Sequence, residues 1–304
     1  MDPWIPITIA AAFFQNLRFM LQKVLKDTSL SAGGATFARF LYGAPLAAIL
    51  LAGLLAVPER RIPAIGLEFL AFACVGGLAQ IIATSCVVAL FSERNFAVGI
   101  GFKKTETVQT AILSLLILGE GVSAFGLFAI LIGLVGVVLM ADAPSASLTP
   151  ASVLRVNAVL NRATGYGLAA GALFGVSAIG YRGATLALGE GDALLRASLT
   201  LALVTAFQSV VMAIYLRVWQ PGQITRVLAT WRVSGLVGLT SILGSLCWFV
   251  AFALQHAAYV KALGQIELVF TFAGSYLVFR ERSTFREIAG IVLVLISVLF
   301  IVLL

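Results

Sequence analysis

Charged side chains are scarce in this chain of 304 residues, of which 11% are Asp, Glu, Lys or Arg and 61% are hydrophobic. A soluble globular domain carries about 25% charged residues and about 45–50% apolar ones. The apolar residues here gather in long runs that follow one another with short polar gaps. This composition argues against a soluble fold and predicts an integral membrane protein.

Residues that commonly ligate metals or attack substrates are also rare, with one His and three Cys. Cys74, Cys86 and Cys247 lie inside apolar runs without paired spacing, so neither a disulfide framework nor a zinc site is indicated. The motifs H-E-x-x-H, G-x-S-x-G and the P-loop do not occur. We therefore expect no catalytic residue, metal or cofactor. A membrane-embedded lipid-modifying enzyme and a structural subunit stay as alternatives.

The apolar runs predict ten membrane-spanning helices. A bilayer core of about 30 Å needs about 20 helical residues for each span. The longest polar stretch divides the spans into five and five, and two units of five spans must enter the membrane in opposite directions. We therefore predict an all-α integral membrane protein built as two inverted five-helix repeats, at 1–141 and 164–304, joined by a loop at 142–163. The predicted spans are 4–22, 33–57, 65–90, 96–118, 121–140, 164–187, 192–216, 233–255, 258–279 and 286–304.

Positive residues are distributed unevenly between the two predicted sides. The loops after the odd-numbered spans hold most of the Lys and Arg residues, while the other side has little beyond Arg60, Arg61 and Arg182. The positive-inside rule then predicts that the richer side is cytoplasmic and that both termini lie outside. The basic residues form no continuous stripe, so we expect a lipid bilayer as partner and no nucleic acid.

Two segments of the chain repeat each other. Ala97–Met140 aligns without a gap on Ala258–Ile301. Internal symmetry over about half the chain is typical of secondary transporters. The identical pairs include Glu106 and Glu267, Thr110 and Thr271, Ser114 and Ser275, and Glu120 and Glu281.

The fourth span carries charge where lipid would be expected. Lys103, Lys104 and Glu106 follow two glycines in an otherwise apolar segment. Lys103 and Glu106 are three residues apart and can pair on one helix face, which leaves Lys104 to meet a substrate. Ionisable groups at membrane depth are costly, so their default interpretation is functional.

The ninth span repeats this plan with Lys261, Gln265 and Glu267. Lys261 and Gln265 are neighbours on one helix face, whereas Glu267 points elsewhere and needs a partner from another span. In the first span, Gln15 and Arg18 begin a polar stripe that should face the bundle interior. The predicted substrate-binding residues are Gln15, Asn16, Arg18, Gln80, Lys104, Glu106, Tyr181, Trp248, Lys261, Gln265 and Glu267.

Four charged residues near span ends have other interpretations. Arg39 and Arg196 occupy comparable places in the two halves, where structural pairing and a gating role are both open. Glu120 and Glu281 end the fourth and ninth spans, and we expect them to act as structural caps rather than as site residues.

Motifs in both halves resemble a known family. Leu118-Gly119-Glu120-x-Val122-Ser123 follows Thr105-Glu106, and Phe279-Arg280-Glu281-Arg282-Ser283-Thr284 follows Glu267. Each of these motifs precedes the last span of its half, and both resemble the closing signature of an EamA domain. Ala38-Arg39-Phe40 is similar to the second-helix motif of that domain. Over nearly its whole length the chain resembles the EamA-type drug/metabolite transporter (DMT) superfamily.

The resemblance implies a ten-helix basket with a central cavity and transport by alternating access. It also implies a location in a bacterial inner membrane, with both termini on the cytoplasmic side. The last point disagrees with the distribution of charge. Family members often carry proline where this chain has Glu106 and Glu267, so the cavity should be more charged than usual.

The function predicted from the sequence is secondary transport of a small polar metabolite, such as an amino acid, a zwitterion or an organic anion. Lys104 and Lys261 would bind its anionic group, and Glu106 or Glu267 would balance charge or carry a coupling proton. The alternative is an exporter of organic cations in which the two glutamates bind the cation. A monomer and a homodimer are both open.

Overall fold

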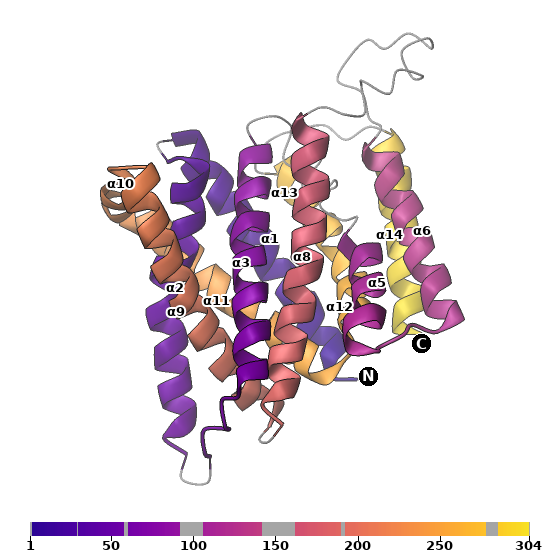
Figure 1. The fold of residues 1–304 in the computed structure, drawn as a ribbon. Helices are drawn as coiled ribbons and strands as arrows, with labels where there is room; N and C mark the ends of the chain where they lie inside the picture. The colour runs from indigo at the N-terminus through magenta and orange to yellow at the C-terminus, as the bar shows by residue number, and fades with distance from the viewer. Residues whose placement is uncertain are drawn as a thin grey trace.

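The computed structural model describes residues 2–28, 30–57, 60–91, 106–141, 162–189, 192–277 and 285–303. All regular structure in these ranges is helical, and the long helices stand side by side in one bundle (Figure 1). Helices suit these apolar runs because a helix satisfies its own backbone hydrogen bonds, which lipid cannot do. The helices are α1 (Trp4–Thr28), α2 (Ala32–Leu55), α3 (Leu67–Leu90), α5 (Glu106–Leu118), α6 (Ala124–Ala141), α8 (Arg162–Ala187), α9 (Ala193–Trp219), α10 (Gln223–Ala229), α11 (Trp231–Leu254), α12 (Ala257–Leu263), η2 (Gly264–Ile266), α13 (Glu267–Leu277) and α14 (Phe285–Val302).

Five of the described helices are long and apolar enough to cross a membrane: α1, α2, α3, α9 and α11. Shorter apolar helices lie within α5, α6 and α14. Large apolar side chains also cover the outside of the bundle; Leu67 is 83% exposed and Phe285 is 85% exposed. An outer surface of this kind suits lipid better than water.

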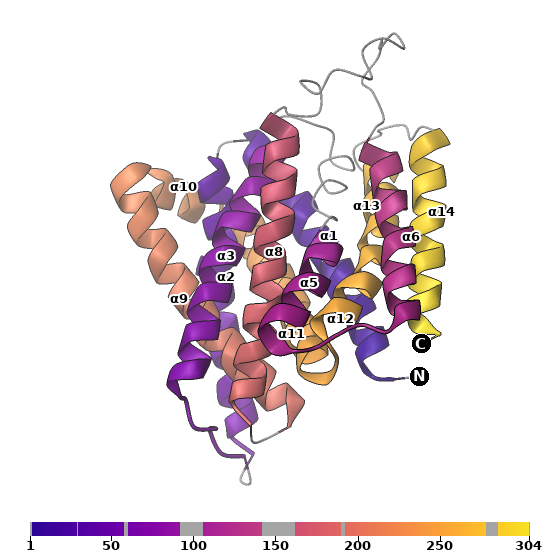
Figure 2. The ribbon, with the colours of Figure 1, turned by 45° about the vertical axis from the view of Figure 1, so that its right-hand side comes forward.

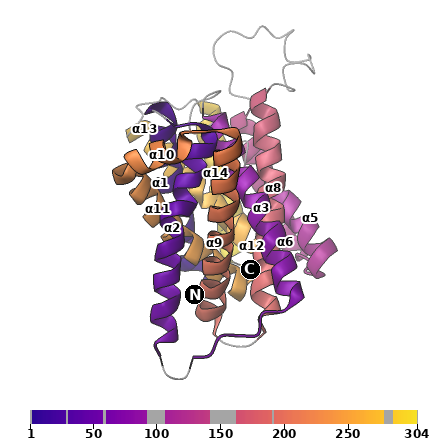
Figure 3. The same cartoon turned by 60° about the vertical axis from the view of Figure 1, so that its left-hand side comes forward.

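Most helix ends lie close to the predicted ones, with two differences. Helix α1 continues to Thr28 rather than ending at residue 22, and Lys26 lies in its last turn, where a positive charge favours the helix dipole. The short helix α10 occupies part of the stretch that the sequence indicated as a polar loop. Figure 3 shows α10 beside the start of α2, at the end of the bundle opposite to the two termini.

Helices α2 and α9 begin at matching capping residues. The Ser31 side chain accepts a hydrogen bond from the Gly34 N–H, and the Asp192 side chain accepts one from the Leu195 N–H. Each cap satisfies an N–H group that the first helical turn leaves without a partner. The two helices pack against each other along the bundle (Figure 3).

The ninth predicted span is helical over its described part, but a 3₁₀ turn interrupts the α-helix. Helix α12 ends at Leu263, a 3₁₀ turn covers Gly264–Ile266, and α13 begins at Glu267. The turn lies against the Trp248 ring, and a Cβ at Gly264 would overlap that ring. Irregular backbone at membrane depth is tolerated where protein surrounds it, and this turn, in which Gly264 and Gln265 are buried, meets that condition.

Each large helix contact joins one helix of residues 4–141 to one of residues 162–302. Helix α3 packs along α8 and α1 along α11, while α2 packs against α9 and α6 against α14 (Figures 1 and 2). The interior is therefore shared between the two halves of the chain. The chain ends, labelled N and C, lie toward the same end of the bundle (Figure 1).

Helices α3 and α8 approach each other most closely at two glycines. A Cβ on Gly180 would stand 2.7 Å from the Gly76 Cα and 2.8 Å from the Phe72 carbonyl oxygen. Small residues at a crossing let two helices pack backbone to backbone in lipid. Gln80 lies one turn after Gly76 on α3 and Tyr181 directly follows Gly180 on α8, and this contact holds the two side chains close to each other.

Candidate functional site

Two narrow cavities lie where the halves of the chain meet, and Gln80, Ser245 and Phe249 line both of them. Each has room for only a water molecule or two. The first cavity is also lined by Arg39, Phe40, Leu201, Val204, Thr205, Gln208, Ser241 and Ile242. The second is also lined by Gln15, Phe174, Ser177, Ala178, Tyr181, Trp248, Phe252 and Lys261.

Arg39 supplies the positive charge of the first cavity. Residues 33–40 of α2 are all buried, so the Arg39 side chain, in a residue only 5% exposed, cannot reach solvent or lipid. Its three nitrogens donate to three hydroxyls: Nε to Ser241 at 2.8 Å, Nη1 to Thr84 at 3.2 Å and Nη2 to Ser245 at 3.1 Å. Among the described residues, Arg39 forms no ion pair with a carboxylate.

Sequence reasoning did not select Arg39 as a site residue. Its three partners lie on α3 and α11, and no sequence spacing brings those helices together. A usable signal existed, because Arg39 is a lone charge in an apolar run with no carboxylate at helical spacing. Arg196, the comparable residue of the other half, is only half-buried and donates to the Thr185 backbone carbonyl at 3.3 Å.

A network of amides and a phenol forms the wall between the two cavities. The Tyr181 hydroxyl donates to Gln80 Oε1 at 2.8 Å, and the Tyr181 ring stacks on Phe249 with centroids 4.3 Å apart. Gln208 Nε2 donates to the same Gln80 oxygen at 3.1 Å and to the Gly77 carbonyl at 2.9 Å. The structure thus brings together two predicted site residues, Gln80 and Tyr181, and adds Gln208, which was not among the predicted site residues.

Lys261 supplies the positive charge of the second cavity and pairs with Glu106 across the two halves. Its Nζ atom lies 3.6 Å from Glu106 Oε2, and both side chains are buried. The same ammonium lies 4.7 Å from the centre of the Trp248 ring, with the Phe174 and Phe252 rings at 5.7 and 5.8 Å. Cation–π contacts of this kind stabilise an ammonium away from water.

The predicted partner of Glu106 was Lys103. Lys103 and Lys104 lie outside the described residues, so the pairing of Lys103 and the substrate role of Lys104 stay predictions. Glu106 is 2% exposed, as its place in an apolar run predicted.

Further predicted residues form hydrogen bonds between the halves of the chain. Gln15 Nε2 donates to Glu267 Oε2 at 3.0 Å, which confirms that Glu267 takes a partner from another span. The Thr271 hydroxyl donates to Asn16 Oδ1 at 3.0 Å, and Gln265 Nε2 donates to Thr107 at 3.2 Å. Of the predicted residues, Gln15, Gln80, Tyr181, Trp248 and Lys261 line a cavity, whereas Asn16, Arg18, Glu106, Gln265 and Glu267 do not.

Arg18 is a second buried guanidinium, 2% exposed. Its Nη1 and Nη2 atoms have no hydrogen-bond partner among the described residues, and its Cζ atom lies 4.2 Å from the centre of the Phe19 ring. Two charges act on it from nearby: Arg39 repels it and Glu267 attracts it.

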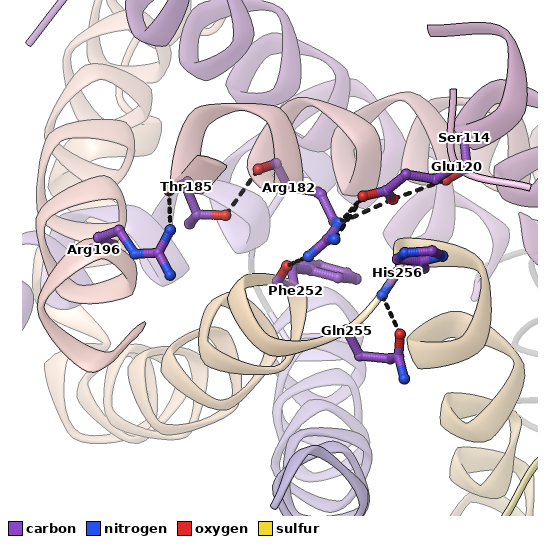
Figure 4. Close-up of polar contacts among 8 residues, drawn as sticks. All are labelled: Ser114, Glu120, Arg182, Thr185, Arg196, Phe252, Gln255 and His256. Carbon is purple, nitrogen blue, oxygen red and sulfur yellow. Dashed lines mark hydrogen bonds and ion pairs between the residues drawn. The ribbon is translucent and has the colours of Figure 1, made fainter. Parts of the chain in front are cut away.

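A further ion pair lies between the end of α8 and the segment that follows α5. Figure 4 shows the Arg182 guanidinium between the Glu120 carboxylate and the Phe252 carbonyl. Arg182 donates to Glu120 through Nε at 2.8 and 2.9 Å and through Nη2 at 2.6 Å, and Nη1 donates to the Phe252 oxygen at 2.5 Å. Glu120 also closes the end of α5, as expected of a structural cap, because its N–H donates to the Ser114 carbonyl at 3.1 Å. The ion pair with Arg182 was not predicted. Since Phe252 also lines the second cavity, the pair lies next to that cavity.

Apolar helices with a lipid-like outer surface, packed around polar cavities that both halves line, define an integral multi-pass membrane protein. Residues 164–303 match the family model described as EamA-like transporter family. Over these residues the chain is similar to this family of membrane transporters.

Comparisons with individual proteins add information on the fold. A search of curated proteins gave no match, whereas 28 chains of solved structures match. One of them, described as a crystal structure of a protein, superposes with a TM-score of 0.70 over 99% of this chain and 96% of that one. At 12% sequence identity this likeness concerns the fold alone.

Proposed function

We propose that the protein is a secondary carrier that moves a small polar metabolite with an anionic group across the inner membrane of a bacterial cell by alternating access. The family supplies the general activity, membrane transport. The position of the two cavities supports a central site, because residues from both halves line each of them.

The signs of the lining charges carry the choice of an anionic substrate. Arg39 lines one cavity and Lys261 the other, while no carboxylate among the described residues lines either. A buried positive charge is costly unless a negative group compensates it. A carboxylate or phosphate on the substrate would provide that compensation.

Helix packing supports two inverted repeats of five spans, within the proposed ranges 1–141 and 164–304. If each helix of one half corresponds to a helix of the other, the α1–α11 and α3–α8 contacts are equivalent to each other. The α2–α9 and α6–α14 contacts then each join equivalent helices. A two-fold relation in the membrane plane has this consequence, and in transporters built this way the substrate site lies at the interface of the repeats, which supports the proposed site.

Alternating access requires that one end of the path close while the other opens. The Arg182–Glu120 pair lies beside the second cavity, where its three-way contact would close that end. We propose protons as the coupling ion, with Glu106 as the carrier. The Glu106 Oε2 atom is buried without a hydrogen bond to a described residue and lies near Lys261, so protonation would release the lysine.

The alternative, an exporter of organic cations, receives less support. Glu106 is paired with Lys261, Glu267 accepts a hydrogen bond from Gln15, and neither carboxylate lines a cavity. A cation entering either cavity would meet Arg39 or Lys261 first.

Uptake by proteoliposomes, measured for a panel of organic anions, zwitterions and cations, tests this proposal. We expect an anionic or zwitterionic compound to be transported, and Lys261→Gln to abolish its uptake. Because this change leaves the buried Glu106 without its ion-pair partner, uptake is compared at equal amounts of folded protein. Arg226→Gln, on the exposed face of α10, is the matched control and should transport normally. Equal uptake by Lys261→Gln and wild type would refute the role of Lys261, and selective uptake of cations would refute the choice of substrate.

A further inference from the structure

We propose that Arg39, Ser241 and Ser245 form an oxyanion-binding subsite that holds the carboxylate or phosphate of the substrate. This inference rests on the proposed carrier function and deepens it. It assigns the anion to an arginine on α2, whereas sequence reasoning assigned it to Lys104 and Lys261.

The hydrogen bonds of Arg39 leave donors available in the first cavity. A guanidinium has five N–H groups, and three are directed at Ser241, Thr84 and Ser245. Each hydroxyl that accepts from the arginine still has its own proton to donate. Since Arg39, Ser241 and Ser245 all line the first cavity, an oxygen placed there can receive hydrogen bonds from a charged donor and two neutral ones.

The three hydroxyls hold Arg39 in place but do not neutralise it. Hydroxyl groups carry no charge, so the burial cost of the guanidinium is only partly offset. Arg182, by contrast, is paired with the Glu120 carboxylate. Arg39 has hydroxyl partners and a cavity in place of that carboxylate.

Arg18 makes the same region more positive. It is 2% exposed, and its terminal nitrogens lack a hydrogen-bond partner among the described residues. Its positive charge repels the positive charge of Arg39. An anion beside Arg39 would relieve the repulsion between the two arginines. The lack of hydrogen bonds to the Arg18 terminal nitrogens among the described residues is independent of the Arg39 hydroxyl contacts and favours the same ligand charge.

Gln80 extends the subsite toward the second cavity. Its Oε1 atom accepts from Tyr181 and Gln208, so its amide N–H₂ group is turned away from these donors and can serve a ligand. Gln80 lines both cavities. A substrate whose oxyanion lies at Arg39 would thus pass along Gln80 to Lys261.

The test measures binding by the full-length protein in nanodiscs, at constant ionic strength. The probes are acetate and succinate for carboxylates, inorganic phosphate and glycerol phosphate for phosphates, and choline for cations. We expect at least one anion to raise the melting temperature, and the two anion types to differ, which identifies the oxyanion. Arg39→Gln should weaken binding of that anion at least about tenfold, as expected when a charged hydrogen bond to a ligand is lost.

Milder and matched variants guard against misfolding. Ser241→Ala and Ser245→Ala keep the arginine, and we expect each to weaken anion binding several-fold with little change in melting temperature without ligand. Arg196→Gln removes the comparable arginine of the other half, which lies outside both cavities, and should bind as wild type does.

Three results would overturn the subsite: no anion stabilises the wild type, only choline does, or Arg39→Gln and both serine variants bind the anion normally. Other results would overturn the proposed carrier function without overturning the subsite, or the reverse. If the wild type binds the anion through Arg39 but proteoliposomes do not exchange it, the subsite stands and the carrier does not. If transport depends on Lys261 and anion binding does not depend on Arg39, the carrier stands and the subsite does not.

Discussion

Arg182 and Glu120 form a buried ion pair in which the Nε and Nη2 atoms of the arginine lie 2.6–2.9 Å from the glutamate oxygens. The pair joins α8 to the segment after α5, and the third arginine nitrogen bonds the Phe252 carbonyl of α11. Three parts of the bundle are thus connected at one charged group beside the second cavity (Figure 4).

Removing one member of this pair should destabilise the protein. Arg182→Gln or Glu120→Gln leaves a buried charge unpaired, for which we expect a loss of about 3–5 kcal/mol. The double variant should lose less than the sum of the two, as measured by unfolding in detergent. Arg60→Gln is the control, because its pair with Asp192 is 28% and 47% exposed and is expected to contribute about 0–1 kcal/mol. Additive single effects would show that the pair is not coupled.

The pairing of Glu106 with Lys261 predicts a separation between exchange and driven transport. If Glu106 carries the coupling proton, Glu106→Gln should still exchange labelled for unlabelled substrate across the membrane, but should no longer accumulate substrate when a pH gradient is applied. The measurement compares counterflow with gradient-driven uptake in the same proteoliposomes. Accumulation equal to wild type would exclude Glu106 as the proton carrier.

The crossing of α3 and α8 should not accept a larger side chain. We expect Gly180→Val to lower stability by about 1–3 kcal/mol or more, because the new atoms would overlap the Gly76 and Phe72 backbone. Gly53→Val is the matched control, since a Cβ at Gly53 meets no atom within 4 Å. The melting temperatures of the two variants in detergent test this, and equal values would mean that the helices separate easily at this crossing.

The distribution of charge predicts the orientation in the membrane. The basic residues Lys23, Lys26, Arg217, Arg226 and Arg232 belong to the ends of α1 and α9, to α10 and to the start of α11. Those segments lie at the end of the bundle opposite to the chain ends (Figures 1 and 3). The positive-inside rule therefore predicts extracytoplasmic termini. Alkaline phosphatase fused after Leu304 should therefore be active, and green fluorescent protein fused at the same place should not fluoresce. The reverse result would support cytoplasmic termini, the orientation that the family resemblance implies.

Burial could be predicted from the sequence where a charged residue lies within a long apolar run. Glu106, Lys261 and Glu267 are buried for that reason. The sequence also indicated that Glu267 needs a partner from another helix, which is Gln15. These inferences depend only on local hydropathy and helical periodicity, both of which are readable along the chain.

Partners that lie on distant helices could not be predicted in this way. The three hydroxyls around Arg39 come from α3 and α11, and Arg182 is far from Glu120 in the chain. Such contacts depend on which helices become neighbours, and a single sequence contains no measure of that. The 3₁₀ turn at Gly264 could not be predicted for a related reason, because the Trp248 ring beside it belongs to another helix.

Trp248 is in contact with three parts of the molecule at once. Its indole lines the second cavity, faces the Lys261 ammonium and rests on the glycine that starts the 3₁₀ turn between α12 and α13. A substrate that displaces the Trp248 ring would therefore also displace the 3₁₀ turn between α12 and α13. Substrate binding would in this way move the start of α13, where Glu267 lies.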